Sequence, residues 1–264
     1  MGRQGDHVTE SRQQRRARQR QQEKRHRSVT VPATEADLVE GWSGGTDCTI
    51  RLATSADVQA ITSLVEYTGI ALPEALVEHL HRADVGAALL SGLRDGPDGV
   101  LQDAGAAFDR LTEPDLRPVY LRAALPLVAE HPTRGVVATL VAYPPMNVVE
   151  QFLDGAPRGE RHKIALGGAV AFVKIKAVAV NEEFRGAGLG RALLQRCVQV
   201  YRQCRYTLLY GQFPAESEHL AGFYRRAGFT VHQPHQSINL WVLFGVDSNL
   251  QADHGERLFA LWAR

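Results

Sequence analysis

Cysteine is scarce in this sequence, and long apolar runs are absent. The three cysteines, Cys48, Cys197 and Cys204, form no CxxC pair, which argues against a disulfide-held fold and against a zinc cluster, so we expect no metal site. No run of about eighteen or more apolar residues occurs, and the N-terminus lacks the apolar core of a signal peptide. The sequence therefore predicts neither a membrane span nor secretion, and we expect a cytoplasmic protein.

The charges are divided unevenly along the chain. The net charge is +1, but residues 1–28 contain nine Lys/Arg and only three Asp/Glu. Because this part has almost nothing apolar to bury, we expect residues 1–46 to form a disordered basic arm. Clustered arginines suit a tether to nucleic acid, with a solvated tail as the alternative. Residues 1–28 contain no aromatic side chain that could stack on bases, so a nucleic-acid partner is not favoured.

Residues 47–264 have the pattern of one domain in which helices and strands are mixed. A strand at 49–52 precedes a helix whose start is marked by Thr54 three residues before Asp57. The segment at about 80–120 is predicted to be an added helical insertion. Strands are expected at 125–131, 136–145, 169–180, 206–213, 237–245 and 257–263, helices at 189–202 and 216–228, and a polar insert at 144–165. This order predicts an α/β fold around one sheet.

The segment AVAVNEEFRGAGLGRALLQRC (177–197) places three glycines, Gly186, Gly188 and Gly190, between a strand and a helix. Such a turn offers free backbone N–H groups and the positive end of the helix dipole to an anion, so a phosphate is the expected ligand. A P-loop would need Lys followed by Ser or Thr after the last glycine, and a dinucleotide fingerprint would need glycine at position 191. Arg191 and Ala192 exclude both.

The turn RGAGLG (185–190) resembles the acyl-CoA loop of the GNAT superfamily of N-acetyltransferases, written Q/R-x-x-G-x-G/A, at positions 185, 188 and 190. The preceding VAVNEEFRG and the later FYRRAGF (223–229) are similar to motifs of the same family, and the resemblance covers most of residues 48–264. It implies a single-domain, mixed and mostly antiparallel sheet flanked by helices. It also implies acetyl-CoA as cosubstrate and an amine as acceptor.

The same resemblance implies roles for individual residues. Main-chain groups of Val178, Ala179 and Val180 would meet the pantetheine arm and the thioester carbonyl, and Tyr224 would be the catalytic acid that protonates the leaving thiolate. Ser217 stands where many relatives have an Asn that contacts CoA, a departure from the family pattern. The residues implied around the CoA pyrophosphate are Arg185, Gly186, Ala187, Gly188, Leu189, Gly190 and Arg191.

The sequence identifies no general base. The expected central strand offers only Lys174 and Lys176, which we expect to face solvent or substrate, and Glu182 and Glu183 are expected to cap the turn. The remaining candidates are Glu216, His232 and His235. A water chain, or an amine that is already neutral, explains the chemistry equally well.

These observations predict an N-acetyltransferase that transfers the acetyl group of acetyl-CoA directly to a primary amine of a small molecule or protein. The excess of acids after residue 28 favours a cationic acceptor. Two alternatives stay open. One is a non-catalytic acyl-CoA-binding sensor module, and the other is an acetyltransferase directed to RNA or ribosomal substrates by the basic arm.

Overall fold

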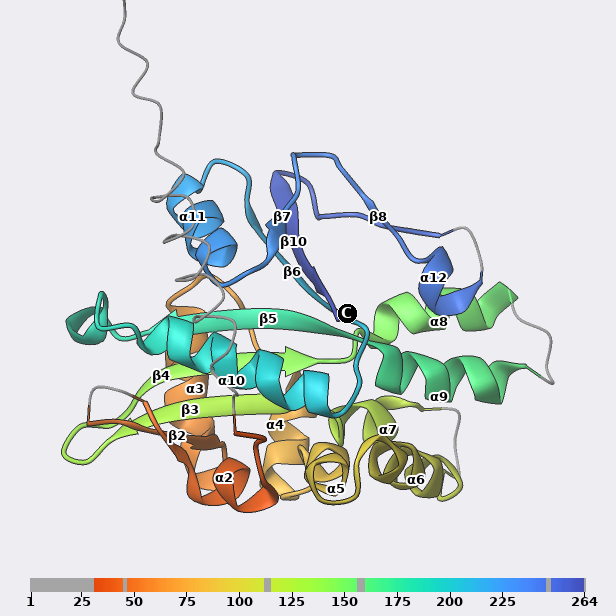
Figure 1. Ribbon diagram of the computed structural model, residues 1–264, viewed down its shortest axis with the longest axis horizontal. Helices are drawn as coiled ribbons and strands as arrows, with labels where there is room; N and C mark the ends of the chain where they lie inside the picture. Colours follow the sequence, from red (N-terminus) through yellow and green to blue (C-terminus); the bar gives the residue numbers. More distant parts are fainter. Residues whose placement is uncertain (1–30, 45–46, 112–114, 156–159, 246–247, 264) are drawn as a thin grey trace, which may run out of the picture. The chain divides into compact units, whose positions relative to one another are not determined.

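An eight-stranded sheet forms the centre of the computed structural model, which describes residues 31–44, 47–111, 115–155, 160–245 and 248–263 (Figure 1). The strand order is β1-β2-β3-β4-β5-β6-β10-β7, and all neighbouring pairs are antiparallel except β5 and β6. The strands are β1 (Trp42–Ser43), β2 (Thr49–Leu52), β3 (Leu125–His131), β4 (Gly135–Tyr143), β5 (Phe172–Val180), β6 (Leu208–Pro214), β10 (Glu256–Trp262) and β7 (Thr230–Val231). The predicted mixed, mostly antiparallel α/β fold is confirmed.

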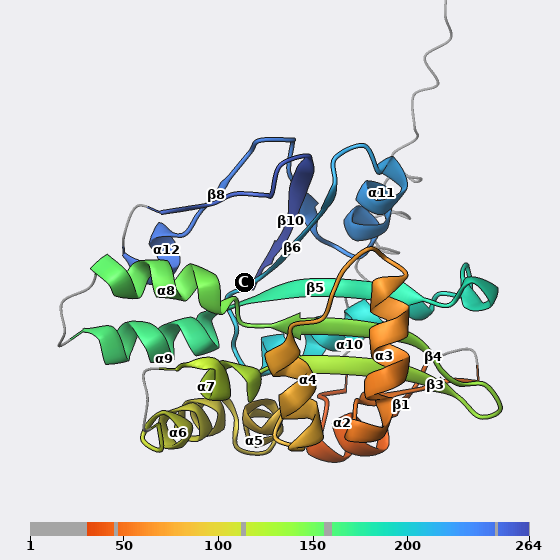
Figure 2. The ribbon, with the colours of Figure 1, turned by 180° about the vertical axis from the view of Figure 1, so that it is seen from behind.

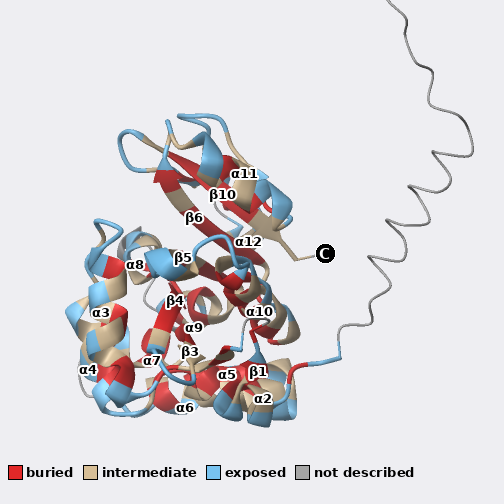
Figure 3. Ribbon diagram, turned by 90° about the vertical axis from the view of Figure 1, so that its left-hand side faces the viewer, coloured by how far each residue is buried: buried red, intermediate tan, exposed pale blue. Residues whose placement is uncertain are grey.

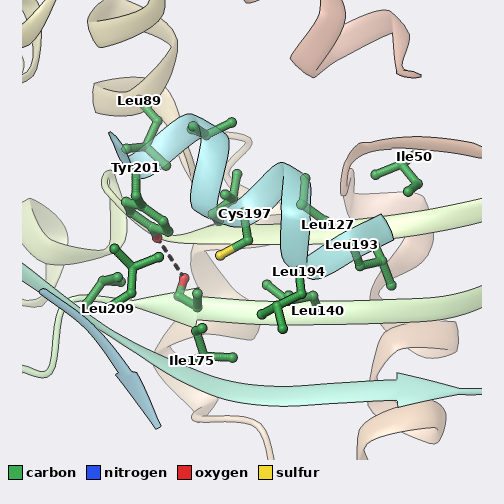
Figure 4. Packing of buried hydrophobic residues seen from close by; sticks show 14 of the residues in the cluster. Ile50, Leu89, Leu127, Leu140, Ile175, Leu193, Leu194, Cys197, Tyr201 and Leu209 are labelled. Carbon is green, nitrogen blue, oxygen red and sulfur yellow. Dashed lines mark hydrogen bonds between the residues drawn. The ribbon is translucent and has the colours of Figure 1, made fainter. Parts of the chain in front are cut away.

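Helix α10 (Leu189–Gln203) covers one face of the sheet and contacts β3, β4 and β5. Its apolar residues recur at helical spacing, and Leu193, Leu194 and Cys197 point onto Leu127, Leu140 and Ile175 of the strands (Figure 4). At the end of the same stripe the Tyr201 hydroxyl donates to the Ala123 and Ala142 carbonyls at 3.0 and 3.3 Å. The amphipathic helix predicted from the sequence is therefore present, and its buried stripe fixes the glycine turn that precedes it.

The opposite face is covered by α3 (Val58–Glu66) and α4 (Glu74–His81), which lie in front of the strands in Figure 2. The 3-10 turn η1 (Ser55–Asp57) leads into α3, and the Thr54 amide donates to Asp57 Oδ2 at 2.7 Å, as the capping pattern predicts. Ile61 and Val65 of α3 are fully buried in a cluster with strand residues. Helices on both faces thus hold the middle of the sheet in place.

Two groups of added helices enlarge the domain. The first is α5 (Ala87–Asp95), α6 (Pro97–Phe108) and α7 (Arg117–Leu121), in the region where a helical insertion is expected. The second is α8 (Met146–Gly155) and α9 (Arg161–Ala171), which fill the polar insert and extend six residues beyond it. The groups share one apolar cluster, within which the Tyr120 hydroxyl donates to the Ala165 carbonyl at 2.7 Å. No described helix is both long and apolar enough to cross a membrane.

The folded unit begins earlier than the sequence predicted. Residues 33–264 form one compact unit, which includes α2 (Glu35–Glu40) and β1 from the segment assigned to the basic arm. Leu38 of α2 is fully buried, and the amide and carbonyl of Ala33 exchange hydrogen bonds of 2.7 and 3.0 Å with the Gln203 side chain. A six-residue helix with one buried leucine has too little periodicity to stand out in a sequence. The expectations for residues 1–30 lie outside the described residues.

Two predicted strands have different limits in the structure. The strand expected at 169–180 begins at Phe172, because α9 continues to Ala171. The segment expected as a strand at 237–245 divides into β8 (Ile238–Asn239), which pairs with β9 (Asn249–Leu250), and the short helix α12 (Trp241–Phe244). The Asn239 side chain accepts from the Trp241 amide at 2.8 Å, and Gly245 ends the helix with a φ of 67°. These local caps outweigh the β propensity of the apolar residues.

Candidate active site

Strands β5 and β6 separate along their length. Their parallel pairing is limited to three residue pairs, the last of which is Lys174 with Tyr210. Beyond this point β5 continues beside β4, while β6 continues beside β10, and Figure 3 shows β6 and β10 turned away from β5. A register shift between β4 and β5 leaves Lys176 as an extra residue, and a bulge of this kind bends its strand. The sheet is therefore open between its two central strands.

A cavity of about 970 Å³ lies at this opening. It reaches from the C-terminal part of α3 across β5 to helix α11 (Glu218–Arg226). Its lining residues are Ala60, Ser63, Leu64, Tyr67, Thr68, Val136, Val178, Ala179, Val180, Asn181, Glu182, Glu183, Arg185, Gly190, His219, Leu220, Phe223 and Tyr224. The cavity thus joins the glycine turn to the aromatic side chains of α11.

The glycine turn has its unusual conformation at Gly186 and Gly188, whose φ angles are 80° and 90°. A Cβ on either would meet no protein atom within 4 Å, whereas one on Gly190 would make ordinary contacts with Val180 and Phe223. The left-handed backbone therefore accounts for the first two glycines without any crowding by the protein. The backbone conformation alone therefore requires glycine at these two positions, and the space above the turn is open.

Gly188 is also the N-cap of α10, whose first intrahelical bond here runs from the Ala192 amide to the Gly188 carbonyl at 2.9 Å. The amides of the residues before Ala192 have no intrahelical acceptor, because a helix leaves its first N–H groups unpaired. Arg185 and Arg191 are exposed on either side of them, and Arg185 Nε donates to the Val180 carbonyl at 3.2 Å. The turn therefore offers backbone donors and positive charge to an anion.

Tyr224 lies on the cavity wall within a cluster of aromatic rings. Its ring stacks on Phe259 with a centroid distance of 3.6 Å and an interplanar angle of 13°, and it lies 5.5 Å from Phe213. Burial raises the pKa of the Tyr224 phenol well above its usual value. The hydroxyl stays protonated at neutral pH, so it has a proton to donate.

The structure brings only some of the predicted site residues to the cavity. Val178, Ala179, Val180, Arg185, Gly190 and Tyr224 line it. Gly186, Ala187, Gly188 and Arg191 lie on the exposed turn, and Leu189 is buried under it. Ser217 is the N-cap residue of α11, and its carbonyl accepts from the amides of Leu220 and Ala221. It is not part of the cavity lining, so its predicted contact with CoA has no support from the geometry.

The candidate bases also differ from the expectation. Lys174 is half-buried, and burial, together with the neighbouring Lys176, lowers the pKa of its ammonium. Asn181, not a glutamate, caps the turn η2 (Glu182–Phe184), because its Oδ1 accepts from the Glu183 amide at 3.1 Å, while the Glu183 carboxylate pairs with Arg134. Among the described residues no group of three or more His, Cys, Asp or Glu side chains is placed to hold a metal ion.

Residues 137–231 match the sequence model of the acetyltransferase (GNAT) domain. The matched segment runs from β4 to β7 and includes both the glycine turn and Tyr224. The chain therefore contains a GNAT acetyltransferase domain, and the predicted family is confirmed for this segment. No curated protein matches the sequence.

Several solved structures resemble the chain at low sequence identity. The YncA protein from Salmonella typhimurium, solved with its cofactor acetyl-CoA, is 18% identical over 83% of this chain and 95% of that chain, with a TM-score of 0.42. The ribosomal-protein-alanine N-acetyltransferase from Brucella melitensis is 18% identical over 81% and 98%, with a TM-score of 0.41. The PaiA N-acetyltransferase from Thermoplasma acidophilum, in complex with coenzyme A, is 12% identical over 81% and 98%, with a TM-score of 0.41.

Proposed function

We propose that this protein is an N-acetyltransferase that moves the acetyl group of acetyl-CoA directly to a primary amine. The observation that carries the proposal is that one cavity joins three features: the part of β5 beyond its pairing with β6, the turn before α10, and the buried phenol of Tyr224. A diphosphate needs backbone donors at a helix N-terminus, a pantetheine arm needs an open strand edge, and a thiolate needs a proton donor. The domain offers all three together.

The residues present fit acetyl-CoA. Open space above Gly186 and Gly188 leaves room for a diphosphate against the unpaired amides of α10. Because β6 leaves β5 after Tyr210, backbone groups of Val178–Val180 that point away from β4 have no strand to pair with there. Apart from the Val180 carbonyl, which accepts from Arg185 Nε, they are free to bond an extended acyl-pantetheine arm, as a strand edge does for a peptide.

The chemistry assigned to the chain follows from these positions. When bound, acetyl-CoA supplies an activated thioester. A backbone N–H of Val178–Val180 stabilises the charge that develops on the carbonyl oxygen, and the Tyr224 hydroxyl donates a proton to the sulfur that leaves. Holding the amine against the carbonyl carbon makes the attack effectively intramolecular, which removes a large part of the entropic barrier.

The first experiment measures the melting temperature with acetyl-CoA, CoA, ATP and NAD, each near 1 mM. A Kd of about 10 µM would stabilise the protein by about 2.7 kcal/mol, which corresponds to a rise of about 5–10 °C for a domain of this size. We expect both CoA species to raise the melting temperature, and ATP and NAD to leave it unchanged. An equal shift with ATP or NAD would refute the assignment of the turn.

The variant Gly188→Glu tests where the cofactor binds, because it adds a carboxylate beside the amides of α10. It should abolish the shift with acetyl-CoA. Gly245→Glu is the matched control, since Gly245 also has a positive φ, of 67°, and no protein atom within 4 Å of a built Cβ. Both variants carry a similar backbone penalty, so only Gly188→Glu should lose the ligand-induced shift.

Turnover is then measured as thiol release with a panel of amines: a diamine, a polyamine, an aminoglycoside, free amino acids, and peptides with an α-amine or a lysine. We expect acetylation of at least one. Binding of acetyl-CoA without turnover on any amine would contradict the proposal and favour the non-catalytic acyl-CoA sensor.

A further inference from the structure

One polar cluster lies where β5 and β6 separate, on the face of the sheet opposite α11. Gly211 is still close to β5, since a Cβ on it would lie 2.8 Å from the Ile175 carbonyl oxygen. The next residue, Gln212, is therefore the first residue of β6 beyond its contact with β5. Gln212 is opposite Leu258 on β10, so Glu256, two residues before Leu258, shares their face.

The two faces of β10 have different neighbours. Arg257 and Phe259 face α11: the Arg257 guanidinium donates to Glu218 at 2.7 Å, and Phe259 stacks on Tyr224. Glu256 and Leu258 face the other way, and Leu258 belongs to the apolar cluster of α8 and α9. Glu256 therefore lies on the face of β10 opposite α11, outside the lining of the cavity, where a second substrate can approach while CoA occupies the side of α11.

The Glu256 carboxylate has polar groups of both signs around it. Lys174 and Lys176 act on its charge from β5, Gln212 acts on it from β6, and Asp253 acts on it from the preceding loop. Gln212 Nε2 also donates to Asp253 Oδ2. Burial raises the pKa of the Glu256 carboxyl above its ordinary value and Asp253 raises it further, against the two lysines and Gln212. A carboxylate with a raised pKa is a better proton acceptor.

Two buried atoms on this face lack a partner. No described residue bonds to Glu256 Oε2 or to His232 Nδ1, although both atoms are buried. The His232 amide donates to the Leu258 carbonyl at 2.9 Å, which places His232 beside β10, diagonal to Glu256. Buried polar atoms in folded proteins are normally hydrogen-bonded, so two unpaired ones on the same face indicate a group supplied from outside the chain.

We propose that Glu256 is the general base of the acetyl transfer, an inference that rests on the proposed function. The acceptor arrives as an ammonium ion, and one N–H proton passes to a Glu256 carboxylate oxygen and then to solvent. The free amine attacks the thioester carbonyl, so that a C–N bond forms and the C–S bond breaks. The thiolate takes a proton from Tyr224, and the second proton lost by the nitrogen restores the phenol through solvent.

Other ionisable groups fit this role less well. Glu182 and Glu183 are exposed on the turn, and Glu183 is paired with Arg134. Asp253 is exposed and accepts from Gln212, which makes it a positioning residue for Glu256. Burial lowers the pKa of the His232 imidazole against the opposing effect of Gln236, so the neutral imidazole is suited to contact the acceptor.

The test uses the amine of highest turnover from the screen and the variant Glu256→Gln, which keeps the size of the side chain and removes its basicity. We expect kcat with this amine to fall about 10²- to 10⁴-fold, while the shift of melting temperature with acetyl-CoA is kept. Raising the pH should restore the rate by about tenfold per unit, because the fraction of free amine rises in that proportion. With hydroxylamine as acceptor, which is largely neutral at pH 7, kcat of the variant should fall far less.

Glu130→Gln is the matched control. Glu130 is a strand carboxylate on β3, which borders none of β5, β6 and β10, and it accepts from Arg51 Nε at 2.9 Å. It should keep wild-type kcat. If Glu256→Gln behaves like Glu130→Gln, or if its loss is the same at every pH and with hydroxylamine, Glu256 is not the base, and the acetyltransferase assignment stands without it.

Two further outcomes are decisive. If the wild-type protein acetylates no amine, the proposed function fails, and this inference fails with it. If Glu256→Gln does not fold, Glu256→Asp replaces it, since it keeps the charge but withdraws the carboxylate by one carbon. A reduced kcat with unchanged binding of acetyl-CoA would then support the base, and a wild-type kcat would overturn it.

Discussion

Gly211→Ala should disturb Tyr224 through the ring of Phe259. A Cβ on Gly211 would lie 2.3 Å from Phe259 Cζ and 2.8 Å from the Ile175 carbonyl oxygen, both shorter than any tolerable contact. Phe259 is fully buried and stacks on Tyr224 at 3.6 Å between centroids. The ring cannot move away from Gly211 without pressing on Tyr224. The absence of a side chain at position 211 therefore sets the position of the proposed proton donor.

The size of the effect follows from overpacking. Adding a methyl group to a close-packed core costs about 1–3 kcal/mol. For a domain of this size each kcal/mol lowers the melting temperature by about 2–4 °C, so a fall of about 2–12 °C is expected. The effect on kcat has an upper limit. Because Gly211→Ala acts on catalysis through Tyr224, it should reduce kcat by no more than Tyr224→Phe does.

The assay is thermal denaturation together with thiol release, with Gly105→Ala as the control. Gly105 lies inside α6, and a Cβ on it would meet no atom within 4 Å, so its replacement should stabilise the protein by about 0.5–1 kcal/mol. A melting temperature of Gly211→Ala at or above that of the wild type would refute the crowding argument. A kcat below that of Tyr224→Phe would refute the claim that the effect passes through Tyr224.

Two further predictions concern catalysis and pH. Tyr224→Phe keeps the aromatic stack and removes the proton of the phenol, so kcat should fall by about 10²-fold or more. The rise of melting temperature with acetyl-CoA should persist. An unchanged kcat would contradict the assigned role. Burial alone would raise the pKa of Asp57, but hydrogen bonds from Arg51 and Thr54 outweigh it and hold the pKa below its usual value. The stability that these bonds contribute is present above about pH 4, the pKa of an aspartate in the unfolded chain. It is lost as the pH falls through the lower pKa that Asp57 has in the folded protein. Asp57→Asn should lower the free energy of unfolding by about 3 kcal/mol at pH 7 and by less in acid. Urea unfolding measures both values. A difference between wild type and variant that does not depend on pH would contradict this account.

The parts of the site that depend on neighbours in sequence could be predicted from the sequence. The turn at 185–190 carries its signal in adjacent residues, since positive φ angles need glycine and the following helix needs an apolar stripe. The same holds for the motif around Tyr224, which is one continuous segment, residues 223–229, at the end of α11 and just after it. The helix α2 and the short α12 were missed because each depends on one or two caps and a few contacts, which periodicity does not register.

The position of Glu256 could not be predicted from the sequence. Its place beside Gln212 and Lys174 depends on the register of β10 against β6 and on where β6 leaves β5, and neither is encoded within a short segment. Nothing in the letters ERLFALW shows that a glutamate there faces a lysine some eighty positions earlier. The one usable signal is the alternation within the strand, which becomes informative only when the neighbouring strands are known.

That alternation links the two halves of the proposed chemistry. Phe259 holds the acid, Tyr224, on one face of β10, and Glu256, three residues earlier, presents the base on the other. A shift of one residue in the pairing of β10 would exchange the two faces and bury a carboxylate against the aromatic cluster. The ion pair of Arg257 with Glu218 and the fit of Phe259 over Gly211 both oppose such a shift. The contacts that fix the register of this strand therefore also keep acid and base on opposite sides of the opening, where an acyl group held between the strands can be reached from both.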